Sequence, residues 1–269
     1  MADKVAWVSG ASSGLGRAAA VALKASGWQV AAGARSFTDR EGEADWGFQL
    51  SLDVRDEASV RAFCERAFNL FGPPQALVNA AGILIMGPAE ETSIQEYEAV
   101  MDTILMGTIR LTQAALPLLR RNGSGKIVMI SSGNGLMPTP FQSAYVAAKH
   151  ALEGYSECLM LETRSQGIQV MLVEPGDHSG GSASYRAASA RVSPLYQDSF
   201  ERVRSIVHQD ETRGGDPERF GRRLAKVMDR KRLPARFRVT AAKEDAAIIL
   251  HDVLPGRLFQ KFLGNYYKV

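Results

Sequence analysis

The chain has 269 residues, of which 45% are hydrophobic and 23% charged, and its formal net charge is only +3. Such a composition is typical of a soluble globular protein. It holds no apolar run near the ~18 residues of a membrane span, no basic pattern with interleaved aromatics that would indicate nucleic-acid binding, and too few cysteines for a disulfide framework.

The cysteines, together with the first residues, lead us to expect a cytoplasmic protein. Met1 to Lys4 leads directly into an apolar segment, without the basic region, long apolar core and cleavage site of a signal peptide. The two cysteines, Cys64 and Cys158, both lie in helical patterns, which favours a reducing compartment. The four histidines are scattered without metal-ligand spacing, so we expect no metal site.

The first predicted element is a buried strand from Val5 to Ser9, followed by a glycine-rich loop and an Ala-rich helix from Arg17 to Ala25. In this context glycines let the backbone approach a pyrophosphate, and the helix N-terminus offers free N–H groups. The alternative is a tight turn without a ligand. The loop residues that we expect to bind a cofactor are Gly10, Ser12, Ser13, Gly14, Leu15 and Gly16.

The second predicted strand, Trp28 to Ala34, ends next to Arg35. NAD-binding units carry an acidic residue near this point for the ribose 2′-hydroxyl, whereas an arginine suits a 2′-phosphate. The position therefore favours NADP(H) over NAD(H). The alternative is an exposed arginine at the end of a strand.

Strands and helices then alternate. We expect further strands at 48–52, 76–78, 126–130, 169–173 and 237–240, helices at 60–71, 95–121, 143–164 and 217–230, and an amphipathic tail at 254–267. This order predicts an α/β fold: a single doubly wound Rossmann-type domain over residues 1–269. Its mostly parallel sheet would have about seven strands, with helices on both faces. Residues 177–215 break the pattern and are predicted to form a mobile substrate loop or lid.

One predicted helix carries a candidate acid–base pair. Tyr145 and Lys149 are four residues apart, so their side chains lie on one helical face. A neighbouring ammonium lowers the pKa of a phenol and lets it exchange protons near neutral pH. Ser132 follows the predicted strand that ends at Ile130 and can supply a hydroxyl to the same point. The alternative is a packed tyrosine beside a solvated lysine.

Together these patterns resemble the short-chain dehydrogenase/reductase family, of the Tyr-x-x-x-Lys type, over nearly the whole chain. The matching residues are Gly10-x-x-x-Gly14-x-Gly16, Asp53-Val54, Asn79-Ala80-Ala81-Gly82, Ser132, Tyr145-x-x-x-Lys149 and Pro175-Gly176. Within the family, the chain is most similar to the NADP-preferring 17β-hydroxysteroid and retinol dehydrogenase-like branch. That similarity rests on Ala34-Arg35, Leu50-x-x-Asp53-Val54-Arg55-Asp56, Leu116-Pro117 and the segment from Phe141 to Lys149.

The resemblance implies an NADP(H)-dependent oxidoreductase that interconverts a ketone or aldehyde and an alcohol. Tyr145 would be the general acid or base, Lys149 would lower its pKa and bind the nicotinamide ribose, and Ser132 would polarise the substrate oxygen. Asp53 would bind the adenine beside Val54, while Asn79, Ala80, Ala81, Gly82, Pro175 and Gly176 would also contact the cofactor. The family also implies a homodimer or homotetramer, formed by the helices at 95–121 and 143–164.

We expect a medium-sized apolar carbonyl or alcohol substrate, in a pocket lined by Ile83, Met86, Leu136, Met137 and Phe141. His178 is either a further lining residue or an exposed loop residue.

Three positions depart from the family pattern. Ile104 stands where the family commonly has an Asn that holds a water linked to the catalytic lysine, so proton relay must take another route or be slow. Ala80 replaces a second Asn, and Gly180 replaces a Thr that bonds the nicotinamide amide, with Ser179 and Ser182 as candidate substitutes. These departures motivate an alternative: an NADP(H)-binding protein with weak or non-redox activity.

Overall fold

A computed structural model describes residues 4–38, 41–179 and 185–269 of the chain. Strand β1 (Lys4–Ser9) lies near the middle of the sheet and shows why the fold has an apolar layer on each side. Val5 and Trp7 pack into one hydrophobic core, and Ala6 and Val8 pack into a second. Successive side chains of a strand point to opposite faces, so a run that is apolar at every position must be covered on both.

The main sheet has the strand order β10-β8-β7-β5-β1-β2-β4-β3. Its strands are β2 (Trp28–Ala34), β3 (Gly42–Ala44), β4 (Gly47–Ser51), β5 (Ala76–Asn79), β7 (Gly125–Ile130), β8 (Ile168–Pro175) and β10 (Arg236–Val239), together with β1. All pair in parallel except β3, which forms an antiparallel hairpin with β4. The mostly parallel α/β sheet is thus confirmed with eight strands. The additional strand, β3, is three residues long and carries no apolar pattern.

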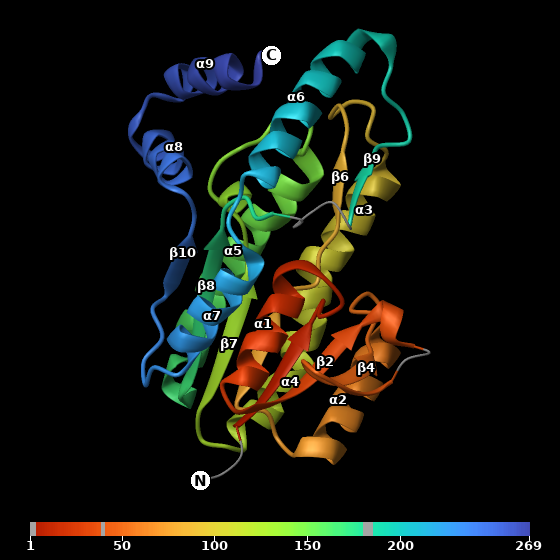
Figure 1. The fold of residues 1–269 in the computed structure, drawn as a ribbon, viewed down its shortest axis with the longest axis vertical. Coiled ribbons are helices and arrows are strands. Elements are labelled where there is room, and N and C mark those ends of the chain that lie inside the picture. Colours follow the sequence, from red (N-terminus) through yellow and green to blue (C-terminus); the bar gives the residue numbers. More distant parts are fainter. Residues whose placement is uncertain (1–3, 39–40, 180–184) are drawn as a thin grey trace.

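Helices cover both faces of this sheet (Figure 1). One core joins the sheet to α1 (Gly14–Ala25) and α7 (Pro217–Met228), and the other joins it to α2 (Glu57–Phe71), α4 (Gly107–Arg120) and α5 (Ser143–Thr163). A glycine allows α7 to lie directly on α1, because a Cβ at Gly221 would be 2.3 Å from the carbonyl oxygen of Ala18.

The helix predicted at 95–121 is interrupted. It consists of α3 (Ile94–Met101), a π-helical turn (Asp102–Met106) and α4. Single π turns within α-helices are frequent at functional sites. This turn contains Ile104, so the departure from the family pattern coincides with the irregular part of the helix.

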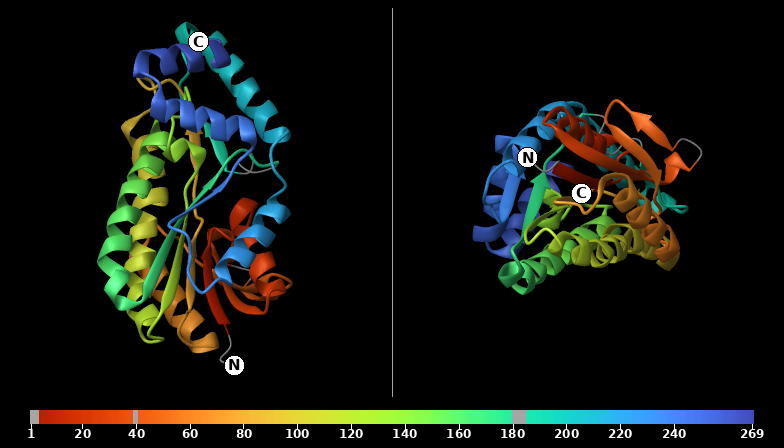
Figure 2. Two further views of the ribbon diagram at one scale, coloured as in Figure 1. Left: turned by 90° about the vertical axis from the view of Figure 1, so that its left-hand side faces the viewer. Right: turned by 90° about the horizontal axis from the view of Figure 1, so that it is seen from below.

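The helices that follow Pro175, other than α7, lie over the carboxyl-terminal end of the sheet (Figure 2). The predicted loop at 177–215 contains β9 (Arg186–Ala188), which pairs with β6 (Leu84–Met86), and α6 (Pro194–Thr212). Two further helices, α8 (Ala242–Val253) and α9 (Gly256–Tyr267), follow β10. α9 matches the predicted amphipathic tail, whereas α8 is not apparent from sequence. No described helix is both long and apolar enough to cross a membrane.

Candidate active site

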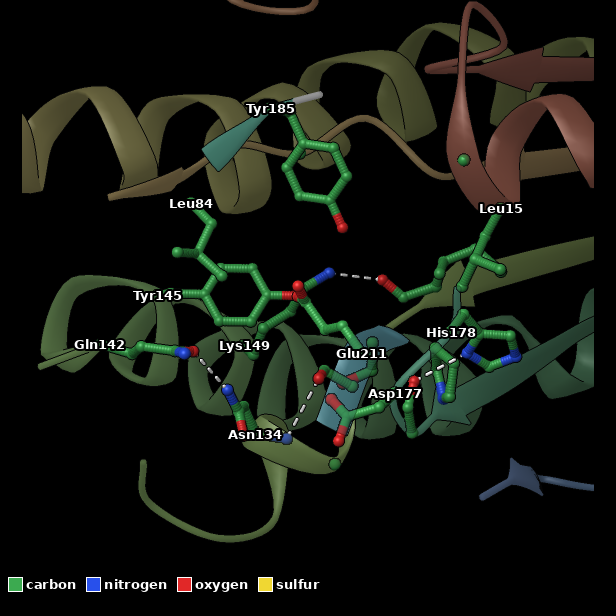
Figure 3. Close-up of a pocket in the computed structure, with 18 of the residues that line it drawn as sticks. Leu15, Leu84, Asn134, Gln142, Tyr145, Lys149, Asp177, His178, Tyr185 and Glu211 are labelled. Carbon is green, nitrogen blue, oxygen red and sulfur yellow. Dashed lines mark hydrogen bonds between the residues drawn. The ribbon is translucent and has the colours of Figure 1, made fainter. Parts of the chain in front are cut away.

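A cavity of about 750 Å³ opens at the carboxyl-terminal ends of the parallel strands. From β1 the chain first builds the sheet toward β4 and then, starting at β5, builds it in the other direction toward β10. Ligands of doubly wound proteins bind at this reversal point. The cavity reaches from the glycine loop after β1 to Ser132, Tyr145 and Lys149, which follow β7 (Figure 3).

The glycine loop is shaped by contacts that only glycine permits. Gly10 has a φ of 67°, and a Cβ there would lie 2.6 Å from the carbonyl oxygen of Ala80. A Cβ at Gly16 would lie 2.3 Å from the carbonyl oxygen of Gly10. The side chain of Ser13 does not cap α1, so the N-terminus of this helix can receive an anionic group at the cavity wall. Ser12, Ser13, Gly14, Leu15 and Gly16 all line the cavity.

The far end of the cavity is bordered by Arg35, Asp53 and Val54. Arg35 is exposed and begins the short helical turn after β2. Asp53 accepts two hydrogen bonds from the guanidinium of Arg55, at 3.0 and 2.7 Å, and these bonds hold the pKa of the Asp53 carboxyl below its usual value. Asp53 is therefore an ionised acceptor at the position where the family binds adenine.

The loop after β5 lies between the two ends of the cavity. The hydroxyl of Ser9 accepts hydrogen bonds from the backbone N–H groups of Ala80 and Ala81, at 3.1 and 3.3 Å, and Gly82 continues the wall. Asn79 differs from expectation, because among the described residues it is not part of the cavity lining. Its amide instead donates to the hydroxyl of Thr112 at 3.0 Å and so ties β5 to α4.

Tyr145 and Lys149 lie one turn apart on α5, with the Lys149 ammonium 5.6 Å from the centre of the Tyr145 ring. Both are buried, with exposures of 9% and 5%, and both line the cavity. Lys149 donates a hydrogen bond of 2.7 Å to the carbonyl oxygen of Ile130. The oxygen of Ser132 accepts a bond from the backbone N–H of Asn134 at 3.1 Å, so its own proton remains available to the cavity.

Burial dominates the acid–base properties of the pair. It raises the pKa of Tyr145, and the nearby Tyr185 adds to this effect while the Ser132 hydroxyl opposes it. The pKa of Tyr145 is thus raised and not lowered as the spacing from Lys149 led us to expect, because the phenol is removed from water. Burial also lowers the pKa of Lys149 to about 8. Across the cavity, the Tyr185 hydroxyl points into the same space as Tyr145 (Figure 3).

Ile104 belongs to the apolar core beside this site. Its side chain is fully buried within the π turn, 3.9 Å from where a Cβ on Gly82 would lie. An aliphatic side chain cannot hold a water by hydrogen bonding. The helix therefore keeps an irregular turn at this position without the polar group that the family commonly has there.

Acidic side chains from the last third of the chain line the cavity near Tyr145, and sequence patterns do not predict them. They are Asp177, Asp210, Glu211 and Glu244. Glu211 is paired with Arg186, and Asp210 with Lys243 at 2.6 Å. Burial, together with the carboxylate of Glu244, raises the pKa of Asp177 to about 7.

Pro175 and Gly176 line the cavity as expected, and so does His178, which is buried. The ring of His178 bonds the carbonyl oxygen of Gly176 at 2.7 Å. Ser179 donates its N–H and its hydroxyl to the carbonyl oxygen of Gly215. Gly180 and Ser182 lie outside the described residues.

The apolar wall differs from the predicted one. Of the five side chains expected there, Met137 lines the cavity, whereas Ile83, Met86, Leu136 and Phe141 are absent from its described lining. Phe141 packs instead against Tyr196 and Phe200 of α6. Their place is taken by Leu84, Val207, Phe262, Leu263, Tyr266 and Tyr267. Most of these residues belong to α6 and α9, whose position over the cavity depends on tertiary packing.

Comparison with known proteins places this geometry in a family. The sequence profile of the short chain dehydrogenases matches residues 4–188. The chain belongs to this family. It is 33% identical over 271 residues to a 3-ketodihydrosphingosine reductase of Bacteroides thetaiotaomicron, covering 100% of both proteins. It is 33% identical over 187 residues to dehydrogenase/reductase SDR family member 7B of Danio rerio, covering 65% of this chain and 60% of that protein.

A solved short-chain dehydrogenase from Streptomyces avermitilis has the same fold. Its TM-score is 0.83 at 31% identity, over 99% of this chain and 96% of the other. With the family model, these relatives show that the chain is an oxidoreductase of the short-chain dehydrogenase family, acting on CH–OH or C=O groups. The family binds nicotinamide cofactors.

Proposed function

We propose that this protein is an NADPH-dependent ketone reductase in which Tyr145 is the general acid. The observation that carries the proposal is the convergence of Ser132, Tyr145 and Lys149 on one cavity that also contains a glycine-rich loop and a helix N-terminus. The loop fits a dinucleotide, because the close backbone contacts at Gly10 and Gly16 form a tight turn that brings Ser12 to Gly16 to the cavity wall at the start of α1.

The proposed chemistry adds one hydride and one proton to a carbonyl group. When bound, the nicotinamide supplies the hydride to the carbonyl carbon. Tyr145 donates its phenolic proton to the carbonyl oxygen, which becomes the hydroxyl of the product. Ser132 donates a hydrogen bond to the same oxygen, and the ammonium of Lys149 stabilises the phenolate that remains on Tyr145.

Tyr145 carries its proton in the resting site, because burial raises the pKa of this phenol. It can therefore act as the acid in a reduction. Burial also disfavours the phenolate that proton transfer leaves on Tyr145, so the reaction depends on the ammonium of Lys149 to stabilise it.

The preference for NADPH is supported by Arg35. It is exposed, lies at the cavity edge beside Ser36, and follows β2, where an acidic residue would otherwise take the ribose hydroxyls. The carboxylate of Asp53 nearby is already paired with Arg55. A 2′-phosphate would therefore meet the exposed guanidinium of Arg35 at this point.

We propose a ketone with a long aliphatic chain as the substrate, of the kind named for the Bacteroides thetaiotaomicron relative. Two observations support this class. That relative covers the whole chain, including the helices after β10. The wall formed by Leu84, Val207, Phe262 and Leu263 is apolar and adjoins Tyr145, as an alkyl chain next to a carbonyl requires.

A chain-length series tests this proposal. NADPH oxidation is measured with 3-ketones of increasing alkyl length, including 3-ketodihydrosphingosine. We expect kcat/KM to rise with each methylene that the wall can bury, by up to about threefold to fourfold, since one buried CH₂ contributes about 0.8 kcal/mol. If none of these ketones supports NADPH oxidation, the alternative of a cofactor-binding protein without ketone reduction is favoured. A cytoplasmic location and a homodimer or homotetramer remain predictions from sequence.

A further inference from the structure

Glu153 is a buried carboxyl group that the proposed chemistry does not use. It lies on α5 one turn beyond Lys149, so the two side chains share one face of the helix. Both residues are buried, with exposures of 6% and 5%. Lys149 itself follows Tyr145 by one turn, and the three residues therefore form a line from the cavity into the protein.

One carboxylate oxygen of Glu153 is fixed by β10. Arg236 Nη1 donates to Glu153 Oε2 at 2.7 Å and also to the fully buried Glu174 of β8, while Arg236 Nη2 donates to Glu157 at 2.6 Å. Arg238 Nε bonds Glu174 at 3.2 Å. Two guanidinium groups thus bind three carboxylates. Arg238 Nη1 also lies 3.5 Å from Asp245 Oδ1. Burial raises the pKa of Glu153 and the carboxylate of Glu174 adds to this effect, while Ser131 and Arg236 oppose it.

The other oxygen of Glu153 is not used by this cluster. Within the described part of the chain, Glu153 Oε1 and Ser131 Oγ are buried atoms without a hydrogen-bond partner of good geometry. Both border Gly135, where a Cβ would lie 3.1 Å from Glu153 Oε1 and 2.6 Å from Ser131 Oγ. Ser131 stands between Ile130, whose carbonyl accepts from Lys149, and the candidate catalytic Ser132. The Oε1 side of the carboxylate, next to Ser131, therefore borders the segment that holds Lys149.

We propose that Glu153 is the buried counter-ion that keeps Lys149 protonated. It is a positioning residue that acts through Lys149 and does not touch the substrate. The consequence for catalysis rests on the proposed function, in which the Lys149 ammonium stabilises the Tyr145 phenolate.

Charge and burial explain why Lys149 needs such a partner. Burial lowers the pKa of Lys149, and the carboxylate of Glu153 opposes this effect. The groups that face Glu153 are Lys149 and Glu157 from α5, Glu174 from β8 and Arg236 from β10. At the position where the family commonly links the lysine to solvent, this chain has the apolar Ile104. A buried carboxylate behind Lys149 supplies the charge stabilisation that Ile104 cannot.

The direct test is a titration of Lys149 in the cofactor-free protein. The rate of Lys149 acetylation by acetic anhydride is measured against pH by peptide mass spectrometry, since Lys149 lines the cavity and a small reagent can reach it. We expect a wild-type midpoint near 8. Glu153→Gln should move this midpoint to lower pH, because the carboxylate of Glu153 opposes the effect of burial on the pKa of Lys149.

Glu157→Gln is the matched control. It removes a carboxylate bonded to the same Arg236, but its side chain is 58% exposed and lies two helical turns from Lys149. The control should leave the midpoint unchanged. Equal midpoints in wild type and Glu153→Gln would overturn the proposal. If Glu153→Gln does not fold, Glu153→Asp takes its place, because the shorter side chain keeps the charge but moves it away from Lys149. The midpoint in Glu153→Asp should be lower than in wild type but higher than expected without the charge. An unchanged midpoint in Glu153→Asp would also overturn the proposal.

Kinetics separate this proposal from the proposed function. In ketone reduction, the basic limb of the pH profile of kcat should move down in Glu153→Gln by the same amount as the acetylation midpoint, and should stay in place in Glu157→Gln. A shifted midpoint in a protein that reduces no ketone would leave the counter-ion standing and reject the function. An unshifted acetylation midpoint in a Glu153→Gln protein that still reduces ketones would reject the counter-ion and leave the proposed function standing.

Discussion

The ammonium of Lys149 donates a hydrogen bond of 2.7 Å to the carbonyl oxygen of Ile130, the last residue of β7. This bond ties the helix that carries Tyr145 to the strand that leads into Ser132. It also holds a charged group in a buried position, where burial brings its pKa from 10.5 to about 8. The site thus holds the Lys149 ammonium at a buried position where an uncharged side chain would make the folded protein more stable.

Replacing Lys149 should therefore stabilise the protein. Between pH 8 and 10.5 the unfolded chain binds more protons at Lys149 than the folded protein does. The buried ammonium therefore lowers the free energy of unfolding fully below pH 8, and this loss of stability disappears as the pH rises from 8 to 10.5. Lys149→Met should raise the free energy of unfolding at pH 7 by about 1–3 kcal/mol, after loss of the Ile130 bond, while abolishing reduction. Urea unfolding of both proteins across this pH range is the measurement; a difference that does not shrink with pH would contradict it.

Gly16→Ala should prevent cofactor binding. The new Cβ would lie 2.3 Å from the carbonyl oxygen of Gly10, so the loop must open before the helix can start. We expect at least a tenfold weaker affinity for NADPH by fluorescence titration, together with a lower melting temperature. Gly154→Ala is the control: it lies in α5 with no atom within 4 Å of its Cβ, and should be neutral or stabilising by about 1 kcal/mol. Unchanged NADPH affinity in Gly16→Ala would show that this loop is not the cofactor cradle.

Arg35→Asp should reverse the cofactor preference. A carboxylate at the cavity edge would repel a 2′-phosphate and could accept from ribose hydroxyls. NADPH affinity should fall by about tenfold to hundredfold, in line with the loss of one charge-assisted contact of about 1.5–3 kcal/mol. NADH affinity should change little. Arg55→Asp would be a poor control because Arg55 holds Asp53; Arg61→Asp, on the exposed face of α2, is suitable. Equal weakening of both cofactors would reject the role of Arg35.

Ile104→Asn should destabilise the protein without improving catalysis. The side chain is fully buried in an apolar core, so an amide there loses apolar burial and leaves polar atoms unpaired. Chemical denaturation should show a loss of about 2–4 kcal/mol, against about 0.5–1.5 kcal/mol for Ile104→Val. A stable Ile104→Asn protein with faster turnover would mean that the site is adapted to the polar residue and that Glu153 does not substitute for it.

The elements with local signals could be predicted from sequence. The strand, glycine loop and helix at the N-terminus are encoded in one continuous stretch, and Tyr145 and Lys149 share a helical face by spacing alone. The parallel sheet follows from the alternation of strands and helices. The strand β3 has no such signal, because Gly42 to Ala44 form a strand only through pairing with β4.

The remaining parts depend on contacts between distant segments. The apolar wall comes largely from α6 and α9, whose place over the cavity is fixed by tertiary packing. Sequence alone left two roles open for the tail at 254–267, adding to an interface or covering the pocket, whereas Phe141 was wrongly expected in the wall. Asn79 bonds Thr112 of α4, a contact that its motif does not indicate. The burial that raises the pKa of Tyr145, and the carboxylate of Glu153 that supports Lys149, likewise appear only once the helix has packed.

The central claim, that Tyr145 transfers the proton, is tested most directly by Tyr145→Phe. Steady-state reduction of 3-ketodihydrosphingosine and of a panel of simpler ketones is measured with NADPH for wild type and variant, with NADPH affinity determined separately. We expect kcat to fall by about 10²–10⁴-fold with the best substrate, which is the size of general-acid catalysis, while NADPH affinity stays within about twofold. A Tyr145→Phe protein that reduces ketones at the wild-type rate would contradict it.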